Sequence, residues 1–267
     1  MLRKIKSYFL HVCQGLRICD KVLLAVLLPA NKLFGISFKI KIYIKNEDGI
    51  FKIRTLRDFN AYTLLRDRKL RPFFKLNGRE IFVDVGANVG RYSFLIANKY
   101  KDSTIIAIEP DARCVSLFKE NLCLNKLENR VKIIEKIAFS TNTTKEFFLN
   151  IGHHEKNTIF ETEITGADKY KGGRGIAPHK KIMVEAVSLD SVIKNVSQRV
   201  GLIKLDIQGA ELDALMGATG ILQKDRPNII FEAWDEFRFQ RINDFLSSFK
   251  YEIEKIDGTN YFAYCLK

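Results

Sequence analysis

The sequence is poor in the residues that build disulfide frameworks and metal centres. Its 267 residues include five cysteines and four histidines, and no two cysteines form a C-x-x-C pair. The number of cysteines is odd, and their spacing resembles neither a zinc site nor a set of disulfides. We therefore expect a cytoplasmic protein in a reducing compartment, without a bound metal ion.

A long apolar run is also missing. The longest one, VLLAVLLPA at residues 22–30, is interrupted by Pro29 and falls short of the roughly 20 residues that a membrane-spanning helix needs. It starts too far along the chain for a signal peptide and lacks a clear cleavage site. Arg17, Lys21 and Lys32 lie around it. Two interpretations stay open: the segment lies on a bilayer surface, or it packs on the main domain.

Acidic residues are scarce in the first third of the chain. Residues 1–80 hold 18 Lys or Arg but 6 Asp or Glu, so they carry +12 of the formal net charge of +13. Such a basic arm suits an anionic membrane reached through residues 1–45, an anionic substrate or a nucleic acid. It is equally compatible with a solvated, lysine-rich face that has no partner.

The hydropathy pattern divides the chain into an arm, residues 1–78, and a main domain, residues 79–267. The arm alternates between helical and strand-like periodicity, and Pro72 ends its last helix. Its predicted elements are a basic helical stretch (1–35), the two strands of a hairpin (37–45 and 50–54) and a helix (57–70).

From residue 79 on, short apolar runs alternate with amphipathic segments. The runs are apolar almost throughout, as in parallel strands that helices cover on both faces. Right-handed crossovers between such strands build a doubly wound, Rossmann-like α/β sheet. The last two runs flank the turn DGTN and predict a terminal antiparallel hairpin. The predicted parallel strands are 81–85, 103–110, 130–139, 200–207 and 228–234, and the predicted helices include 111–125, 210–222 and a short one with Asp190 as its N-cap.

The alternation breaks between residues 140 and 181. Two strand-like runs flank residues 153–180, which are polar and lack periodicity. A loop of this length in a compact domain is usually functional or mobile. Its histidines, His153, His154 and His179, either reach into a site as part of a lid or are solvated bystanders.

The run IFVDVGANVG (81–90) brings an acid, an asparagine and two glycines to the end of a buried strand. Gly86 and Gly90 permit a tight turn and a close backbone approach. Asn88 between them tolerates a left-handed conformation. The helix that follows directs free N–H groups at whatever the turn holds. The spacing matches neither the dinucleotide fingerprint G-x-G-x-x-G nor a Walker loop.

Carboxylates stand at the ends of four of the predicted parallel strands. In an open α/β sheet, ligands bind at the carboxyl ends of the strands, near the topological switch point. An acid at Glu109 can accept hydrogen bonds from both ribose hydroxyls of an adenosine ligand. We therefore expect the four acids to lie around one ligand site. They are Asp84, Glu109, Asp206 and Glu232.

Four blocks, FVDVGANVGRYSFLIA, AIEPD, VEAVSLDSVI and IKLDIQGAE, resemble the FkbM family of S-adenosylmethionine-dependent methyltransferases in order and spacing. The resemblance covers about residues 79–235 and departs from the family at Gln208, where the family commonly has Glu. It implies a class I methyltransferase fold. It also implies transfer of a methyl group from S-adenosylmethionine to a hydroxyl of a small, carbohydrate-like or glycolipid-like acceptor. The residues implied to hold the cofactor are, from its methionine end to its adenine, Asp84, Gly86, Asn88, Gly90, Glu109 and Ala138.

A sulfonium already activates its methyl group, so catalysis needs chiefly the alignment of the acceptor oxygen with the methyl carbon. A base that removes the hydroxyl proton adds to the rate. Asp206 is the first candidate for that base or for orienting the acceptor. Glu232, at the end of the next strand, is the second.

Two other functions stay open. A nucleic-acid methyltransferase acting on RNA has the same fold and would hold phosphates on the basic arm. Against it, Asp206 is not part of an N-P-P-Y-type motif, and the Pro-Cys nucleophile of base C5 methylation is missing. We therefore expect no nucleic-acid partner. A non-enzymatic module that binds a membrane or a partner would explain the arm, but not the polar groups at the strand ends.

Overall fold

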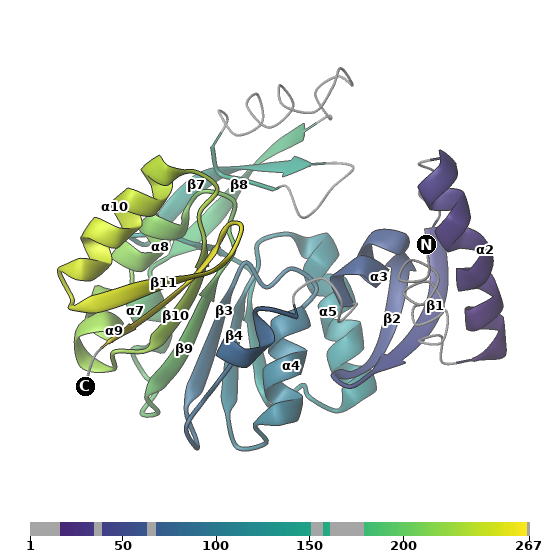
Figure 1. Ribbon diagram of the computed structural model, residues 1–267, viewed down its shortest axis with the longest axis horizontal. Helices are drawn as coiled ribbons and strands as arrows, with labels where there is room; N and C mark the ends of the chain where they lie inside the picture. The colour runs from purple at the N-terminus through teal and green to yellow at the C-terminus, as the bar shows by residue number, and fades with distance from the viewer. Residues whose placement is uncertain (1–16, 35–38, 63–67, 151–156, 161–178, 266–267) are drawn as a thin grey trace.

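The computed structural model describes residues 17–34, 39–62, 68–150, 157–160 and 179–265. Its largest sheet has the strand order β11-β12-β10-β9-β3-β4-β5 (Figure 1). The strands from β10 to β5 are parallel, and β12 runs antiparallel to both β10 and β11. The predicted doubly wound sheet with a terminal antiparallel hairpin is therefore confirmed. The strands are β3 (Ile81–Val85), β4 (Thr104–Ile108), β5 (Val131–Ile134), β9 (Val200–Leu205), β10 (Asn228–Glu232), β11 (Tyr251–Asp257) and β12 (Asn260–Cys265).

The central strands are buried on both faces, as the apolar runs predict. Every residue of β3 and β9 is buried. Successive side chains point to opposite faces of the sheet, so Phe82 joins a core with α4 and α5, and Val83 joins a core with α7 to α10. Figure 1 shows these helix groups on opposite sides of the sheet. The helices are α4 (Arg91–Lys99), α5 (Ala112–Asn125), α7 (Leu189–Ile193), α8 (Glu211–Met216), α9 (Thr219–Lys224) and α10 (Glu236–Ser247).

Strand β3 lies at the topological switch point of the sheet. It pairs with β4 on one side and with β9 on the other, both in parallel. The connections from β3 and from β9 therefore lead away to opposite faces, and a crevice opens at the carboxyl ends of these two strands. This arrangement brings loops far apart in the sequence to one edge of the sheet.

The N-terminal arm packs against the side of the main domain that α5 forms (Figure 1). Asn125 and Asn121 reach from α5 to the arm, where their amides bond the backbone of Ile50 and Lys52. The arm consists of α2 (Ile18–Phe34), the antiparallel hairpin of β1 (Lys39–Asn46) and β2 (Gly49–Thr55), α3 (Leu56–Tyr62) and a 3₁₀ turn, η1 (Arg71–Phe73).

The arm and the main domain share one hydrophobic core. Phe51 from β2 packs edge-on against Phe94 from α4, with ring centroids 4.9 Å apart. The division of the chain at residue 78 stays a prediction, although the apolar side chains of the arm are buried together with those of α4 and α5.

The helix predicted over 57–70 is shorter than its apolar spacing indicates. It ends at Tyr62, residues 68–70 form a turn, and Pro72 lies within the 3₁₀ turn that follows. The proline fixes its own φ and lacks an N–H, which suits the first turn of a helix and not its interior. Residues 63–67 lie outside the described part of the chain.

A second, smaller sheet stands beside the carboxyl edge of the first. It has the order β6-β8-β7, formed by β6 (Ile137–Ala138), β8 (His179–Val187) and β7 (Thr143–Asn150). The single strand predicted over 130–139 is therefore wrong. Glu135 and Lys136 interrupt its apolar run and form ion pairs at the surface with Lys119 and Glu185, and the chain changes sheet between β5 and β6.

Two local predictions about helices need correction. Ser188, and not Asp190, caps α7: its hydroxyl accepts the N–H of Ser191. The carboxylate of Asp190 instead accepts the N–H groups of Gly220 and Ile221 in α9. The helix predicted over 210–222 is broken into α8 and α9.

No helix within the described ranges is long and apolar enough to cross a bilayer.

Candidate active site

The carboxyl ends of β3, β4, β9 and β10 surround a cavity of about 500 Å³. A cavity of this volume suits a nucleotide-sized ligand. Asp84 and Gly90 are not among the residues that line it. The other six residues predicted from the sequence do line it: Gly86, Asn88, Glu109, Ala138, Asp206 and Glu232.

Left-handed backbone shapes the loop after β3. The φ angle is +75° at Gly86, +52° at Asn88 and +86° at Gly90. A side chain at Gly86 would collide with the carbonyl oxygen of Asp206, and one at Gly90 with the ring of Phe118. Gly86 therefore lets the loops after β3 and β9 meet at the cavity. Gly90 lets α4 begin directly against α5, behind the cavity wall.

Asp84 lies beneath the cavity and not on its wall. Its side chain is buried, and Ser93 Oγ donates a hydrogen bond to its Oδ2 at 2.6 Å. Burial raises the pKa of Asp84 to about 6, although the bond from Ser93 and the charge of Lys204 oppose this shift. Asp84 thus ties β3 to the first turn of α4 and supports the glycine turn from behind. The direct cofactor contact expected for Asp84 is not favoured by this geometry.

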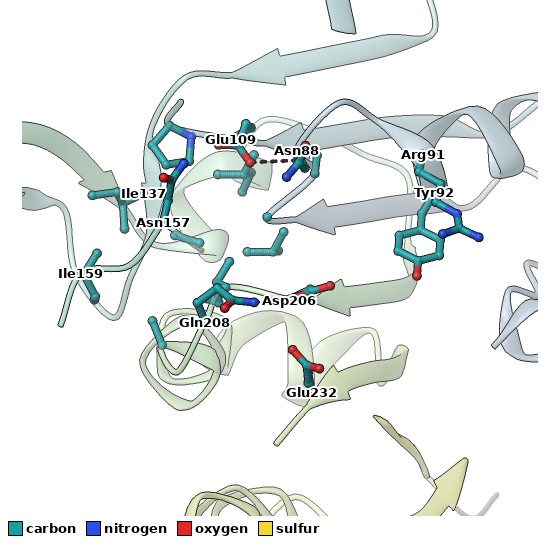
Figure 2. A pocket seen from close by; sticks show the side chains of 18 of the residues that line it. Asn88, Arg91, Tyr92, Glu109, Ile137, Asn157, Ile159, Asp206, Gln208 and Glu232 are labelled. Atoms are coloured by element: carbon teal, nitrogen blue, oxygen red, sulfur yellow. Dashed lines mark hydrogen bonds between the residues drawn. The ribbon is translucent and has the colours of Figure 1, made fainter. Parts of the chain in front are cut away.

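Glu109 is held in place by the backbone of two loops. Its Oε2 accepts the N–H of Asn88 at 2.8 Å (Figure 2). Its Oε1 accepts the N–H of Asp111, also at 2.8 Å. The carboxylate is therefore oriented while it lines the cavity. The Oδ1 atom of Asn88 beside it is buried and has no hydrogen-bond partner among the described residues. A buried acceptor of this kind suits a donor from a ligand.

An apolar wall lies beyond Glu109. Ile137 and Ala138 of β6 line the cavity together with Ile159. Figure 2 shows Ile137 and Ile159 on the opposite side of the cavity from Tyr92. An apolar surface next to a buried carboxylate is an environment that suits an adenine ring. The adenine contact expected for Ala138 stays a prediction, although Ala138 lines the cavity.

A short strap, residues 157–160, crosses the edge of this wall. Asn157 Nδ2 donates to Asp111 Oδ2 at 2.8 Å, and Thr158 Oγ1 donates to the carbonyl oxygen of Gln208 at 3.2 Å. The strap therefore links the loop after β4 to the loop after β9. Sequence reasoning missed it, because these residues lie inside a polar segment without periodicity.

The three histidines whose role was left open, as part of a lid or as solvated bystanders, do not belong to residues 157–160. His179 begins β8, where its Nε2 lies 3.2 Å from Asn150 Nδ2, and it does not line the cavity. His153 and His154 lie outside the described residues. No group of three or more His, Cys, Asp or Glu side chains in the described ranges could hold a metal ion. The expectation of a reaction without metal stays a prediction.

Two acids occupy the other end of the cavity, away from Ile137 (Figure 2). Thr259 Oγ1 donates to Glu232 Oε1 at 2.8 Å. Burial raises the pKa of Glu232, and the charge of Asp206 raises it further, whereas hydrogen bonds from Trp234 and Thr259 lower it. The Asp206 side chain is 40% exposed. Burial and the charge of Asp206 both favour the protonated form of Glu232 by raising its pKa.

A lysine beneath this acid pair was missed, although it stands in the quoted block IKLDIQGAE. Lys204 is fully buried, and its Nζ donates to the carbonyl oxygen of Leu205 at 3.1 Å. The same atom lies 3.5 Å from Asp206 Oδ2 and 5.5 Å from the centre of the Tyr92 ring. An apolar strand pattern conceals such a residue, because a buried lysine is rare unless it is paired.

Glu211 fixes the loop that carries Asp206. It is buried at the start of α8, and its carboxylate accepts the N–H groups of Ile207 at 3.0 Å and Gly209 at 3.1 Å. Burial raises its pKa to about 7, while these backbone bonds oppose the shift. Glu211 therefore does more than complement the dipole of α8: it holds the left-handed turn at Gln208 and Gly209.

Four more side chains line the acid end of the cavity and were not predicted. Tyr92 stacks on Phe74, with ring centroids 4.7 Å apart. Trp234, which follows β10, is 36% exposed. Arg91 and Tyr92 lie within the block FVDVGANVGRYSFLIA, but no local pattern marks the four residues as neighbours, because only the folded sheet brings β10, β12 and α4 together. They are Arg91, Tyr92, Trp234 and Asn260.

Comparison with known proteins matches the chain to a family of methyltransferases. A family model described as the methyltransferase FkbM domain matches residues 84–253. Methyltransferase sdnD of Sordaria araneosa is 27% identical over 177 residues, which cover 60% of this chain and 68% of that protein. Methyltransferase 1 of Beauveria bassiana is 26% identical over 144 residues, covering 51% of this chain and 57% of that protein.

A solved structure supports the fold. The methyltransferase FkbM of Methylobacillus flagellatus KT superposes with a TM-score of 0.51 at 15% identity, over 98% of this chain and 59% of that one. The chain therefore spans somewhat more than half of the length of this structure and of the Beauveria relative. At this identity the likeness concerns the fold alone.

Proposed function

The chain belongs to the FkbM family of methyltransferases, and from this premise we propose that it methylates a hydroxyl oxygen of a small, carbohydrate-like or glycolipid-like acceptor. Its cofactor is S-adenosylmethionine, the methyl donor of enzymes with this fold. When bound, S-adenosylmethionine supplies an activated methyl group on a sulfonium. The other requirements of the reaction fall on the residues around the cavity.

The cavity fits this cofactor. Gly86 has no side chain where the loops after β3 and β9 approach, so backbone groups can lie against a ligand there. Asn88 Oδ1, which has no partner in the described part of the chain, supplies an acceptor for a ligand N–H or O–H group. Glu109 is oriented by backbone bonds and can accept hydrogen bonds from vicinal ribose hydroxyls. Ile137 and Ala138 give the adenine an apolar wall.

Two acids that line the cavity, Asp206 and Glu232, are our candidates for binding the acceptor. Methylation of a hydroxyl forms a carbon–oxygen bond, breaks the carbon–sulfur bond and releases one proton. A carboxylate within reach of the hydroxyl can take that proton as the bond forms. The raised pKa of Glu232 suits it to hold the proton. Asp206, whose side chain is 40% exposed, is suited to orient the hydroxyl and to pass the proton to solvent.

The lining of the acid end supports a polyhydroxylated ring as the acceptor. Trp234 presents an aromatic surface at the cavity, and Asn260 adds an amide beside the two acids. Carboxylates and amides bind hydroxyl groups in defined directions, while an aromatic face packs against the C–H side of a sugar. The lining of the cavity thus includes the kinds of groups that bind carbohydrates.

The convergence of Glu109 with the Asp206–Glu232 pair on one cavity carries this proposal. We would measure binding of S-adenosylmethionine by calorimetry and transfer of its labelled methyl group to a panel of free and lipid-linked sugars. Glu109→Gln should weaken cofactor binding about tenfold or more, because a charge-assisted hydrogen bond is lost.

Glu146→Gln is the matched control, since Glu146 is an exposed acid of β7 that pairs with Lys181. It should bind the cofactor as the natural protein does. Equal cofactor binding by the two variants would remove Glu109 from the site. Transfer of the label to an RNA and to no sugar would replace the proposed acceptor class.

A further inference from the structure

Helix α2 carries an apolar stripe on its outer face. Ile18, Val22 and Val26 have side chains that are 82%, 59% and 62% exposed. Residues four apart lie on one face of a helix, so the three side chains form a continuous strip, which we call the α2 stripe. Leu23 beside it is 39% exposed.

The opposite face of α2 is fixed to the arm. Leu24 and Asp20 are buried, and Asp20 accepts hydrogen bonds from the side chain and the backbone N–H of Arg17. The guanidinium of Arg17 lies 5.0 Å from the centre of the Tyr43 ring in β1. Because the inner face already has its apolar contact and a capped first turn, the orientation of α2 is determined. The stripe is therefore a second apolar face, directed away from the hairpin.

The charge of the arm near the stripe is mostly positive. Lys21 of α2 is exposed, as are Lys41 and Lys45 of the neighbouring strand β1. The exposed acid that follows β1, Glu47, is paired with Arg71. The one acid of α2, Asp20, is buried and paired. Residues 1–80 carry 18 basic and 6 acidic side chains. The outer side of this helix thus presents aliphatic and cationic groups without an exposed carboxylate.

This chemistry matches a lipid surface better than a protein partner. Protein interfaces rely on aromatic anchors such as Trp and Tyr, whereas the stripe consists of Ile and Val. An amphipathic helix with an apolar strip and flanking lysines lies in the plane of a bilayer, with the strip at the acyl boundary and the lysines among anionic headgroups. We propose that α2 docks the protein on bilayers that contain anionic lipids. This proposal does not depend on the acceptor of the methyl group.

The test is flotation of the full chain with vesicles of phosphatidylcholine, with and without phosphatidylglycerol, at low and high salt. We expect binding to the anionic vesicles and weaker binding at high salt, because salt screens the lysines. In a variant with Ile18→Ser, Val22→Ser and Val26→Ser, the affinity for the anionic vesicles should fall by about tenfold or more. This variant loses most of the apolar area that enters the bilayer.

The matched control is Leu124→Ser, Met183→Ser and Met216→Ser, which removes three exposed apolar side chains from other surfaces. It should bind the vesicles as the natural protein does. Val22→Trp provides a gain-of-function test that does not rely on the triple variant. Its new fluorophore should shift to the blue with anionic vesicles and strengthen flotation, because tryptophan prefers the membrane interface.

Failure of the natural protein to float with anionic vesicles would overturn the proposal. So would equal flotation of the stripe variant, or an unchanged emission of Val22→Trp. A dimer in lipid-free solution that the stripe variant converts to a monomer would assign the stripe to a second copy of the chain instead.

Discussion

Lys204 Nζ lies 3.5 Å from Asp206 Oδ2, and the two side chains differ sharply in exposure, at 1% and 40%. A buried ammonium is costly to desolvate, and removal of one partner of an ion pair costs most when the other charge is left buried. Asp206 is partly exposed, so water can solvate it when the cation is removed. The cation also acts on Glu232, whose pKa it lowers against the effects of burial and of Asp206. Lys204 is therefore a positioning residue for the acid pair, held where it does not touch the cavity.

Lys204→Met should lower turnover without a comparable loss of thermal stability. Without the cation, the pKa of Glu232 rises further. The carboxylate is then ionised only at higher pH, and the acid limb of the rate profile should move to higher pH. Lys132→Met, which changes an exposed lysine of β5, is the control. A rate profile of Lys204→Met that coincides with that of the natural protein would contradict this role.

Asp206→Asn and Glu232→Gln should each reduce the rate of methyl transfer, by about 10²- to 10⁴-fold where the acid serves as the base. Cofactor affinity should change little, because the residues proposed to bind the cofactor, Glu109 and Asn88, line the other end of the cavity. Single-turnover rates and calorimetry separate these two effects. Asp102→Asn, at an exposed position, serves for comparison. Unchanged turnover in either site variant removes that acid from the mechanism.

Three glycines allow a graded test of the turn. Gly86→Ala should abolish cofactor binding, because the new methyl group meets the Asp206 carbonyl and φ is +75°. Gly78→Ala also has a positive φ but open space, so it should cost about 1 kcal/mol of stability and leave binding intact. Gly258→Ala has open space and should have little effect. Chemical denaturation measures the stability of the three variants, and calorimetry measures their affinity for the cofactor. Equal cofactor affinities of Gly86→Ala and Gly78→Ala would refute the steric argument.

Glu211→Gln should flatten the dependence of stability on pH. Burial raises the pKa of Glu211 from 4.5 to about 7, so the folded state binds a proton that the unfolded state has released. The free energy of unfolding must then fall as pH rises from about 4.5 to 7. Asp84 contributes with the same sign, up to about pH 6. Urea unfolding at several pH values should show a steeper decline for the natural protein than for the variant, and parallel curves would count against the shift.

Trp234→Ala should weaken use of the acceptor but not binding of the cofactor. Its ring lines the acid end of the cavity, and the loss of an aromatic contact should raise KM for the acceptor more than it lowers kcat. Phe237→Ala is a suitable comparison, because Phe237 is exposed but does not line the cavity. Equal KM values for Trp234→Ala and the natural protein would place the acceptor elsewhere.

The parallel sheet, the acids at the ends of its strands and the glycine turn were predictable from the sequence, because they depend on local patterns. Apolar runs covered on both faces predict parallel strands, and such strands deliver Glu109, Asp206 and Glu232 to one edge. The glycine turn is likewise a local feature, because its backbone has positive φ angles that glycine adopts without strain. What escaped prediction depends on tertiary contacts: the change of sheet after Glu135, the strap at Asn157, and the position of Trp234 on the cavity that Asp206 also lines.

Lys204 shows a different limit. Its position in the run IKLDIQGAE was visible, but a strand buried on both faces predicts apolar side chains at every position. Burial of its ammonium depends on the carbonyl of Leu205 and the carboxylate of Asp206. A charged residue in an otherwise apolar strand, two positions before an acid, is therefore a signal worth reading in related sequences.

The contact between the arm and the glycine turn has a consequence for exchanging parts between relatives. The hydroxyl of Tyr62 in α3 donates a hydrogen bond to the carbonyl oxygen of Val89 and accepts one from the side-chain amide of Asn121. Ala61 and Leu70 reach the cavity itself. The arm, the turn and α5 are therefore joined by direct contacts into one packed unit. A chimera that takes its first 78 residues from a relative should need the matching α5 as well, or lose the fit around the methyl donor.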